Sequence, residues 1–373
     1  MARNVRRNAR LPMDAGRDRI GDLMTQSTSS TSPAAGMDIL NTLYSAAFTA
    51  QVMRAFVKLR IADHLASGPR TPAGLAEPLD AHQDALAAFL DTCAANGLVT
   101  RGKGGEYAVT DRGLLLRSGS AMASHVLYAA GPGVNRAYEQ MSEVVLTGRS
   151  GGEVAGQHVY DYYGEHPEEA EAFEKVMSET TAECVNALVD VHDFTAYGRI
   201  VDVGGGRGTL LSRVLAAAPK AEGVLFDMPH VVDMARSSLP AEVSADVLER
   251  IEFTGGSFLE SVPSGADLYM VKSILVDWSD EEVTRLLGNL HRVMSPGSRL
   301  LIVDWFAQDG ATASRTAGYE AIASFGSRTL WGGRLRPLAE FEALLTATGF
   351  TIDQITTGFA PCLFPWNLIV AHR

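Results

Sequence analysis

The residues with the clearest chemical potential form a glycine-rich run, Asp202-Val203-Gly204-Gly205-Gly206-Arg207-Gly208. It follows the apolar segment 200–203 directly, and a helical pattern from Leu210 to Ala218 comes after it. Glycine adopts backbone angles that other residues avoid and lets a ligand approach the main chain, and a helix N-terminus presents free amide groups. The pattern therefore predicts a ligand-binding turn between a strand and a helix.

Asp227 ends the next apolar segment, Val224-Leu225-Phe226-Asp227. A carboxylate at this place can accept both hydrogen bonds of a ribose diol. The glycine spacing D-x-G-x-G-x-G differs from the dinucleotide fingerprint G-x-G-x-x-G, because Thr209 follows Gly208. It resembles motif I of S-adenosylmethionine (SAM) methyltransferases, so we expect an adenosyl ligand at this turn.

The elements that position these residues are short apolar runs that alternate with helical patterns from residue 199 onward. The expected strands are 200–203, 224–226, 251–253, 268–271, 300–303 and 368–371. Such alternation predicts an α/β fold, a doubly wound, mostly parallel sheet of the Rossmann-like type. Ser279 and Glu282 form a capping-box pattern that starts one helix, and Pro296-Gly297 should end it.

The chain before the sheet divides into three predicted parts. Residues 1–35 are basic and Ser/Thr-rich and predict a disordered tail, or a start codon further along, since Met24 and Met37 follow. Residues 36–120 combine helical patterns with a hairpin that turns at Gly104-Gly105, which predicts a mostly helical winged-helix domain. Residues 121–190 predict a helical linker and substrate-pocket region, and residues 191–373 the SAM-binding domain.

Composition limits the possible partners and compartments. Asp and Glu number 44 against 32 Lys and Arg, a net charge of −12, which argues against a protein that binds nucleic acid phosphates. Three separated cysteines, Cys93, Cys184 and Cys362, form no disulfide or zinc pattern. No membrane span or export signal is evident, so we expect a cytoplasmic protein without metal.

The chain resembles the small-molecule O-methyltransferase family with an N-terminal dimerisation domain, the plant phenolic and bacterial antibiotic type. The resemblance covers residues 38–373. It depends on five ordered motifs, which are residues 59–65, 201–208, 255–258, 272–281 and 332–341. It implies a homodimer that binds SAM and acts on a small aromatic or polyketide-like substrate.

The resemblance also implies the roles of individual residues. Gly204 and Gly206 would line the methionine part of SAM, Asp227 would hold the ribose, and Ser257 with Phe258 would flank the adenine. Ser257 replaces an Asp found in many members. The other expected residues are Asp202 and Lys272 for the cofactor, and Tyr163, His166, Phe173, Met177 and Trp331 for the substrate pocket.

Several of these candidates have a second interpretation. Phe173 and Met177 belong to an apolar stripe that is equally typical of an ordinary core. The aromatic cluster around Tyr163 and His166 is also compatible with a surface turn. Arg334 and Arg336 could pair with a carboxylated substrate or face solvent.

The proton-handling positions depart from the family pattern. Val276 stands where plant enzymes carry a histidine general base, and Leu335 stands where a supporting glutamate is expected. A hydrocarbon cannot accept a proton. The second supporting glutamate corresponds to Asp304, which could be a base, an orienting residue or a structural cap. The pattern is more similar to the anthracycline-tailoring branch, which includes methyltransferases without the histidine.

Three hypotheses follow from the sequence. The first is methyl transfer to a hydroxyl, mainly by proximity, because holding an acceptor in line can contribute on the order of 7–11 kcal/mol whereas a general base contributes about 10²- to 10⁴-fold. The second is a family member that keeps SAM bound for decarboxylation, hydroxylation or ring formation, or that methylates carbon or nitrogen. The third is a SAM-responsive winged-helix regulator.

Overall fold

The computed structural model describes residues 33–307, 317–360 and 365–373. The chain divides into two compact units, Met1–Gln51 and Val52–Arg373. Nearly all of the predicted tail, together with Cys362, lies outside the described residues. None of the helices in the described ranges is long and apolar enough to cross a membrane.

The N-terminal part has the helix and hairpin content expected of a winged helix. Its elements are α2 (Pro33–Lys58), α3 (Ile61–Leu65), α4 (Pro72–Leu79), α5 (Gln83–Ala95), β1 (Val99–Arg101) and β2 (Tyr107–Val109). Strands β1 and β2 pair antiparallel, and the hairpin turns through Gly105 at φ 85°. Phe56, Ile61 and Leu90 are fully buried in its core, because apolar side chains at helical spacing form one buried face. The prediction of this fold is confirmed.

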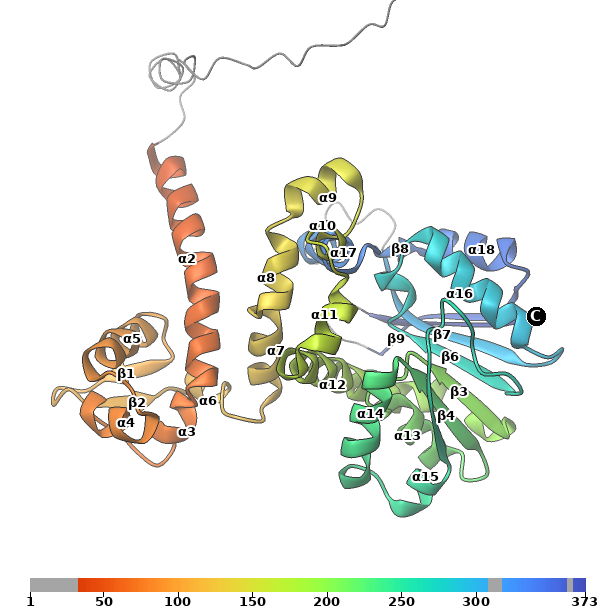
Figure 1. Cartoon of the computed structure of the whole chain (residues 1–373), viewed down its shortest axis with the longest axis horizontal. Coiled ribbons are helices and arrows are strands. Elements are labelled where there is room, and N and C mark those ends of the chain that lie inside the picture. The colour runs from red at the N-terminus through yellow and green to blue at the C-terminus, as the bar shows by residue number, and fades with distance from the viewer. Residues whose placement is uncertain (1–32, 308–316, 361–364) are drawn as a thin grey trace, which may run out of the picture. The chain divides into compact units, whose positions relative to one another are not determined.

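A run of helices leads from the hairpin to the sheet (Figure 1). They are α6 (Asp111–Leu114), α7 (Ala121–Ala129), α8 (Pro132–Tyr138), α9 (Met141–Thr147), α10 (Gly151–Val154), α11 (Val159–Glu165) and α12 (Pro167–Val191). Helix α12 begins with Pro167 in its first position and two glutamates in its first turn, both of which favour a helix start.

The C-terminal sheet has the strand order β5-β4-β3-β6-β7-β10-β9, with the short β8 (Arg336–Pro337) paired to β7. Its other strands are β3 (Arg199–Val203), β4 (Glu222–Asp227), β5 (Ile251–Gly255), β6 (Leu268–Lys272), β7 (Arg299–Ala307), β9 (Thr351–Ala360) and β10 (Trp366–His372). Strands β3 to β7 run parallel, whereas β10 is antiparallel to both neighbours. The chain reverses its winding direction between β3 and β6, and open α/β sheets bind ligands beside such a reversal.

Helices cover both faces of this sheet. They are α13 (Thr209–Ala217), α14 (Pro229–Ser238), α15 (Ala245–Glu249), α16 (Asp280–Val293) and α18 (Leu338–Ala347), with 3₁₀ turns η1 (Phe194–Ala196), η2 (Leu239–Ala241) and η3 (Leu275–Asp277). Helix α17 (Ala317–Trp331) packs instead against α8, α9, α10 and η3. The predicted capping box of Ser279 and Glu282 starts α16.

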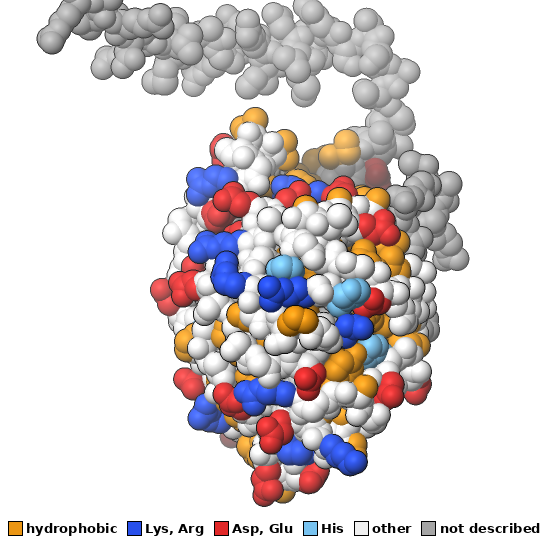
Figure 2. Space-filling model, turned by 90° about the vertical axis from the view of Figure 1, so that its right-hand side faces the viewer, with side chains coloured by type: hydrophobic (Ala, Val, Ile, Leu, Met, Phe, Trp, Pro, Cys, Tyr) orange, Lys and Arg blue, Asp and Glu red, His pale blue; other side chains and the backbone are white. Residues whose placement is uncertain are grey.

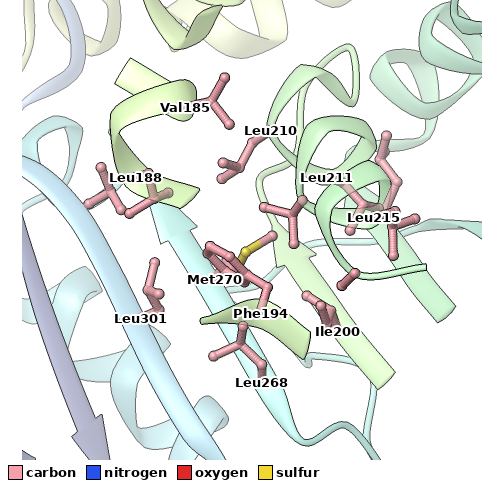
Figure 3. Packing of buried hydrophobic residues seen from close by; sticks show 14 of the residues in the cluster. Val185, Leu188, Phe194, Ile200, Leu210, Leu211, Leu215, Leu268, Met270 and Leu301 are labelled. Atoms are coloured by element: carbon pink, nitrogen blue, oxygen red, sulfur yellow. The ribbon is translucent and has the colours of Figure 1, made fainter. Parts of the chain in front are cut away.

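Two hydrophobic clusters lie on opposite sides of the sheet, because successive side chains of a strand point to opposite faces. On strand β3, Ile200 belongs to one cluster and Val201 to the other. Figure 3 shows the first cluster, in which Leu188 of α12 and Leu211 of α13 pack over strands β3, β6 and β7. The core therefore fixes α12 and α13 against the carboxyl end of β3.

Candidate functional site

The glycine run forms a tight turn between β3 and α13. Gly204 has φ 73° and Gly206 has φ 53°, backbone angles that residues with a side chain rarely adopt. A Cβ atom on Gly204 would collide with the side chain of Ile274, so the turn also lacks space for a side chain. A side chain is therefore excluded at Gly204, and both glycines line a pocket.

Asp227 connects this turn to the next strand. It lies at the end of β4, and its Oδ2 accepts a hydrogen bond of 2.8 Å from the Gly206 amide, while its Oδ1 accepts one of 2.7 Å from the Met228 amide. Burial raises the pKa of the Asp227 carboxyl, and these two amide hydrogen bonds oppose the shift. Each carboxylate oxygen keeps acceptor capacity toward the adjoining pocket.

One pocket opens beside the turn, at the carboxyl ends of the parallel strands. All seven residues that the sequence assigns to cofactor binding line it, and so do Phe173 and Met177 of α12. The remaining lining residues are Tyr160, Glu174, Ser178, Thr181, Gly205, Arg207, Thr209, Leu210, Met228, Val231, Gly256, Ser273, Ile274, Asp277 and Trp278.

The pocket takes its electrostatic character from acidic and basic side chains in its lining, which are Glu174, Asp202, Asp227, Asp277, Lys272 and Arg207. Burial raises the pKa of Glu174 to about 8, with Asp227 adding to the shift, and raises that of Asp202 to about 7. Lys272 is half-buried, and burial lowers its pKa. The Oδ2 atom of Asp202 has no hydrogen-bond partner among the described residues. Four acids against two basic side chains favour a ligand that brings positive charge.

An aromatic wall closes another side of the pocket. The Tyr160 hydroxyl donates a hydrogen bond of 2.8 Å to Asp277 Oδ2, and the Tyr160 and Trp278 rings stack with centroids 5.9 Å apart. Burial raises the pKa of Asp277 to about 8. A phenol and a carboxyl group therefore face the ligand space together.

The three positions that the sequence linked to proton handling lie behind the pocket lining. Val276 and Leu335 are buried apolar side chains, and Asp304 is fully buried. Asp304 accepts hydrogen bonds from the amides of Val276 (3.3 Å) and Trp305 (2.9 Å). Burial raises its pKa to about 6. Because it accepts a hydrogen bond from the Val276 amide, Asp304 fixes the main chain of the η3 turn.

Three of the expected substrate-pocket residues do not line this pocket directly. Tyr163 and Trp331 pack against Phe173, with ring centroids at 5.1 and 6.4 Å. His166 stacks on Tyr162 at 3.8 Å, and its Nδ1 lies 2.8 Å from the Tyr162 carbonyl oxygen. Tyr163 and Trp331 therefore support Phe173 from behind the pocket wall, and His166 packs on Tyr162 instead.

Arg334 and Arg336 have partners within the protein. Arg336 is 1% exposed and donates hydrogen bonds to Asp280 and to the Trp278 carbonyl oxygen. Arg334 pairs with Asp280 and with Glu340. The prediction that they bind a carboxylated substrate or face solvent is therefore wrong for Arg336, because its guanidinium stabilises the η3 loop.

Sequence reasoning missed Glu174 and the pairing of Tyr160 with Asp277. Glu174 carried a visible signal, because it is an acid placed next to Phe173 and one helical turn before Met177 and Ser178. The pairing of Tyr160 with Asp277 had none, since 117 positions separate the two residues.

The site is that of a SAM-dependent methyltransferase of the Rossmann-like class. A glycine turn and the acid that ends β4 line one pocket at the carboxyl edge of a mostly parallel sheet. The family model of the O-methyltransferase domain matches residues 138–351 of the sequence. The family model of the O-methyltransferase dimerisation domain matches residues 42–118. The chain belongs to this O-methyltransferase family.

Known relatives cover nearly the whole chain. Mitomycin biosynthesis 6-O-methyltransferase of Streptomyces lavendulae is 32% identical over 86% of this chain and 91% of its own length. The solved structure of the mitomycin 7-O-methyltransferase MmcR has a TM-score of 0.81 at 30% identity, over 91% of this chain and 98% of that one. NcsB1 is an O-methyltransferase from neocarzinostatin biosynthesis that was solved with SAM and 2-hydroxy-5-methyl naphthoic acid. It has a TM-score of 0.75 at 27% identity, over 89% of this chain and 98% of that one.

Proposed function

We propose that this enzyme transfers the methyl group of SAM to a hydroxyl of a small aromatic or polyketide-type natural product. The observation that carries the proposal is that all seven cofactor residues expected from the sequence line a single pocket. Phe173, Met177 and Trp278 line the same pocket and offer flat or polarisable surfaces to an aromatic acceptor.

The residues present fit SAM on structural grounds. The Gly204–Gly206 backbone lines the pocket and would contact the methionine part. Asp227 would accept the ribose hydroxyls, and Ser257 with Phe258 would flank the adenine. Glu174 and the unpartnered Oδ2 of Asp202 would compensate the positive charge of the cofactor.

Bound SAM supplies an electrophilic methyl group. The protein contributes an enclosed place for the acceptor next to it, and positioning of this kind accounts for a larger part of a rate than a general base does, on the order of 7–11 kcal/mol in favourable cases. Since Val276 occupies the position of the usual histidine, we propose that proximity dominates here. Asp304 acts as a positioning residue that holds the backbone of Val276.

Relatives support a natural-product acceptor. NcsB1 was solved with a hydroxynaphthoic acid, and the relative from Streptomyces lavendulae bears a mitomycin biosynthesis name. Purified protein incubated with labelled SAM and a panel of phenols and hydroxynaphthoic acids should transfer label to product and yield S-adenosylhomocysteine. Failure of every phenol to acquire label would reject the proposal.

A second candidate is non-methyl chemistry with retained SAM, or methylation of nitrogen or carbon. Val276 and Leu335 favour it, and so does a relative of 27% identity named aclacinomycin 10-hydroxylase RdmB. A relative of 31% identity is named as an N,N-dimethyltransferase. The mass change of the product separates these outcomes, because methyl transfer adds one CH₂ unit and consumes SAM.

We also propose that the enzyme works as a homodimer. The matched dimerisation domain supports this, and so do Ile39, Leu43 and Phe48, which are 61–67% exposed on α2. Exposed apolar side chains grouped on one helix are typical of a protein interface.

A further inference from the structure

The pocket wall contains a phenol and a carboxyl group in direct contact. The Tyr160 hydroxyl donates to Asp277 Oδ2 over 2.8 Å, and both residues line the pocket. Asp277 directly follows Val276, so the carboxyl group lies one residue beyond the position of the absent histidine. The pair is thus part of the pocket wall, whereas Val276 itself lies behind it.

Both members of the pair are held in place. His158 and Trp278 stack with Tyr160, with ring centroids 5.5 and 5.9 Å away. On the other side, the Ser327 hydroxyl donates to the Val276 carbonyl oxygen over 2.7 Å, and Arg336 donates to the Trp278 carbonyl oxygen over 2.7 Å. Asp277 lies between these two anchored carbonyl groups, and a fixed orientation is what proton transfer requires.

The surrounding charges set the direction of proton transfer. Burial raises the pKa of Asp277 to about 8 and Asp304 adds to the shift, while the Tyr160 hydrogen bond and Lys272 oppose it. Burial also keeps the pKa of Tyr160 and of the neighbouring Tyr128 well above the usual phenol value. Tyr160 therefore stays protonated in the working pH range, and Asp277 is the member that gains or loses a proton.

We propose that Tyr160 and Asp277 together accept the proton of the acceptor hydroxyl, a role that the missing imidazole has in plant-type relatives. The proposal rests on methyl transfer as the proposed function. The hydroxyl proton passes to the Tyr160 oxygen while the Tyr160 proton passes to the Asp277 carboxylate. The acceptor oxygen bonds the methyl carbon, the carbon–sulfur bond breaks, and its electron pair stays on sulfur. Asp277 then returns the proton to water.

Asp277→Asn and Tyr160→Phe test the pair. Using a phenol that the wild-type enzyme methylates, we expect kcat at pH 8 to fall roughly 10²-fold in Asp277→Asn and less in Tyr160→Phe, with KM nearly unchanged. In the wild type, kcat/KM should rise with pH and level off above about pH 8, as Asp277 loses its proton. This acid limb of the profile should be lost in Asp277→Asn. Tyr162→Phe is the matched control, because Tyr162 also donates to a carboxylate, Glu169, at 3.1 Å, outside the pocket.

Two further measurements keep the test independent of turnover. The infrared difference spectrum between the wild type and Asp277→Asn should contain a carboxylic acid band that disappears as pH rises through about 8. Calorimetry should give equal SAM affinity for both proteins. An Asp277→Asn variant that keeps the wild-type kcat and the acid limb of the pH profile would overturn the inference. A wild-type enzyme that methylates no phenol would overturn the proposed function instead.

Discussion

The amide of Val276 donates a hydrogen bond of 3.3 Å to Asp304 Oδ2. The carboxylate that the sequence associates with proton handling therefore holds the main chain of the residue that occupies the base position. Because Asp304 is fully buried and also accepts from the Trp305 amide, its removal takes away the acceptor of both hydrogen bonds.

We predict that Asp304→Ala lowers the free energy of unfolding by about 2–3 kcal/mol, the cost of losing these two hydrogen bonds. Urea denaturation measures this loss. Asp304→Asn keeps one acceptor oxygen and should lose less. If Asp304 were the proton acceptor itself, Asp304→Asn would instead move the acid limb of the pH–rate profile.

The second prediction concerns the ribose site. Asp227→Ala should weaken SAM binding by roughly 10²-fold, because charge-assisted hydrogen bonds contribute about 1.5–3 kcal/mol each and the Gly206 amide also loses its partner. Isothermal calorimetry gives the affinity. Asp233→Asn, an exposed acid on the following helix α14, is the control and should bind SAM normally.

The sheet and the cofactor side of the pocket were predictable because their signals are local. Strands β3 and β4 are mostly apolar, the glycine turn follows β3 directly, and Asp227 ends β4. Strand β9 was missed because it is half exposed and contains Thr, Asp and Gln, a composition typical of a sheet edge. The Tyr160–Asp277 pair was not predictable, since only the packing of α11 against η3 brings the two residues together.

The third prediction follows from the apolar Val276. With proximity as the main contribution, the rate should depend steeply on how readily the acceptor ionises. Among phenols of similar shape, the more acidic ones should be methylated faster at pH 7, and the difference should shrink as pH rises. Initial rates across a series of substituted phenols measure this dependence. A rate that is independent of phenol acidity would show that another step limits turnover.

The fourth prediction tests the exposed apolar side of α2. Replacing Ile39 and Leu43, one helical turn apart, by lysine should shift the protein from dimer to monomer, since buried apolar contacts dominate interface stability. Light scattering after size-exclusion chromatography gives the mass in solution. Asn41→Lys adds charge to the opposite side of the same helix, the side that carries Phe48, and shows whether that side also belongs to the interface. An unchanged dimer in the double variant would place the interface elsewhere.

The last prediction concerns pH and the pocket carboxyl groups. Burial raises the pKa values of Glu174 and Asp277 to about 8, of Asp202 to about 7 and of Asp304 to about 6. The folded protein without ligand therefore binds more protons than the unfolded chain between about pH 4 and pH 8, and its stability falls as pH rises through this window. Each such group contributes about 1.4 kcal/mol per pH unit while it differs in protonation between the two states.

Glu174→Gln removes one of these groups without changing its shape. It should raise the melting temperature at pH 8 and leave it nearly unchanged at pH 4, where Glu174 is protonated in the folded protein. The same substitution should weaken SAM binding at pH 8, since the ionised Glu174 would face the cationic cofactor. Wild-type binding should release a proton, which calorimetry detects in buffers of different ionisation enthalpy. Glu171→Gln, an exposed acid on the same helix, should change neither quantity, and proton release that persists in Glu174→Gln would assign it to another carboxyl group.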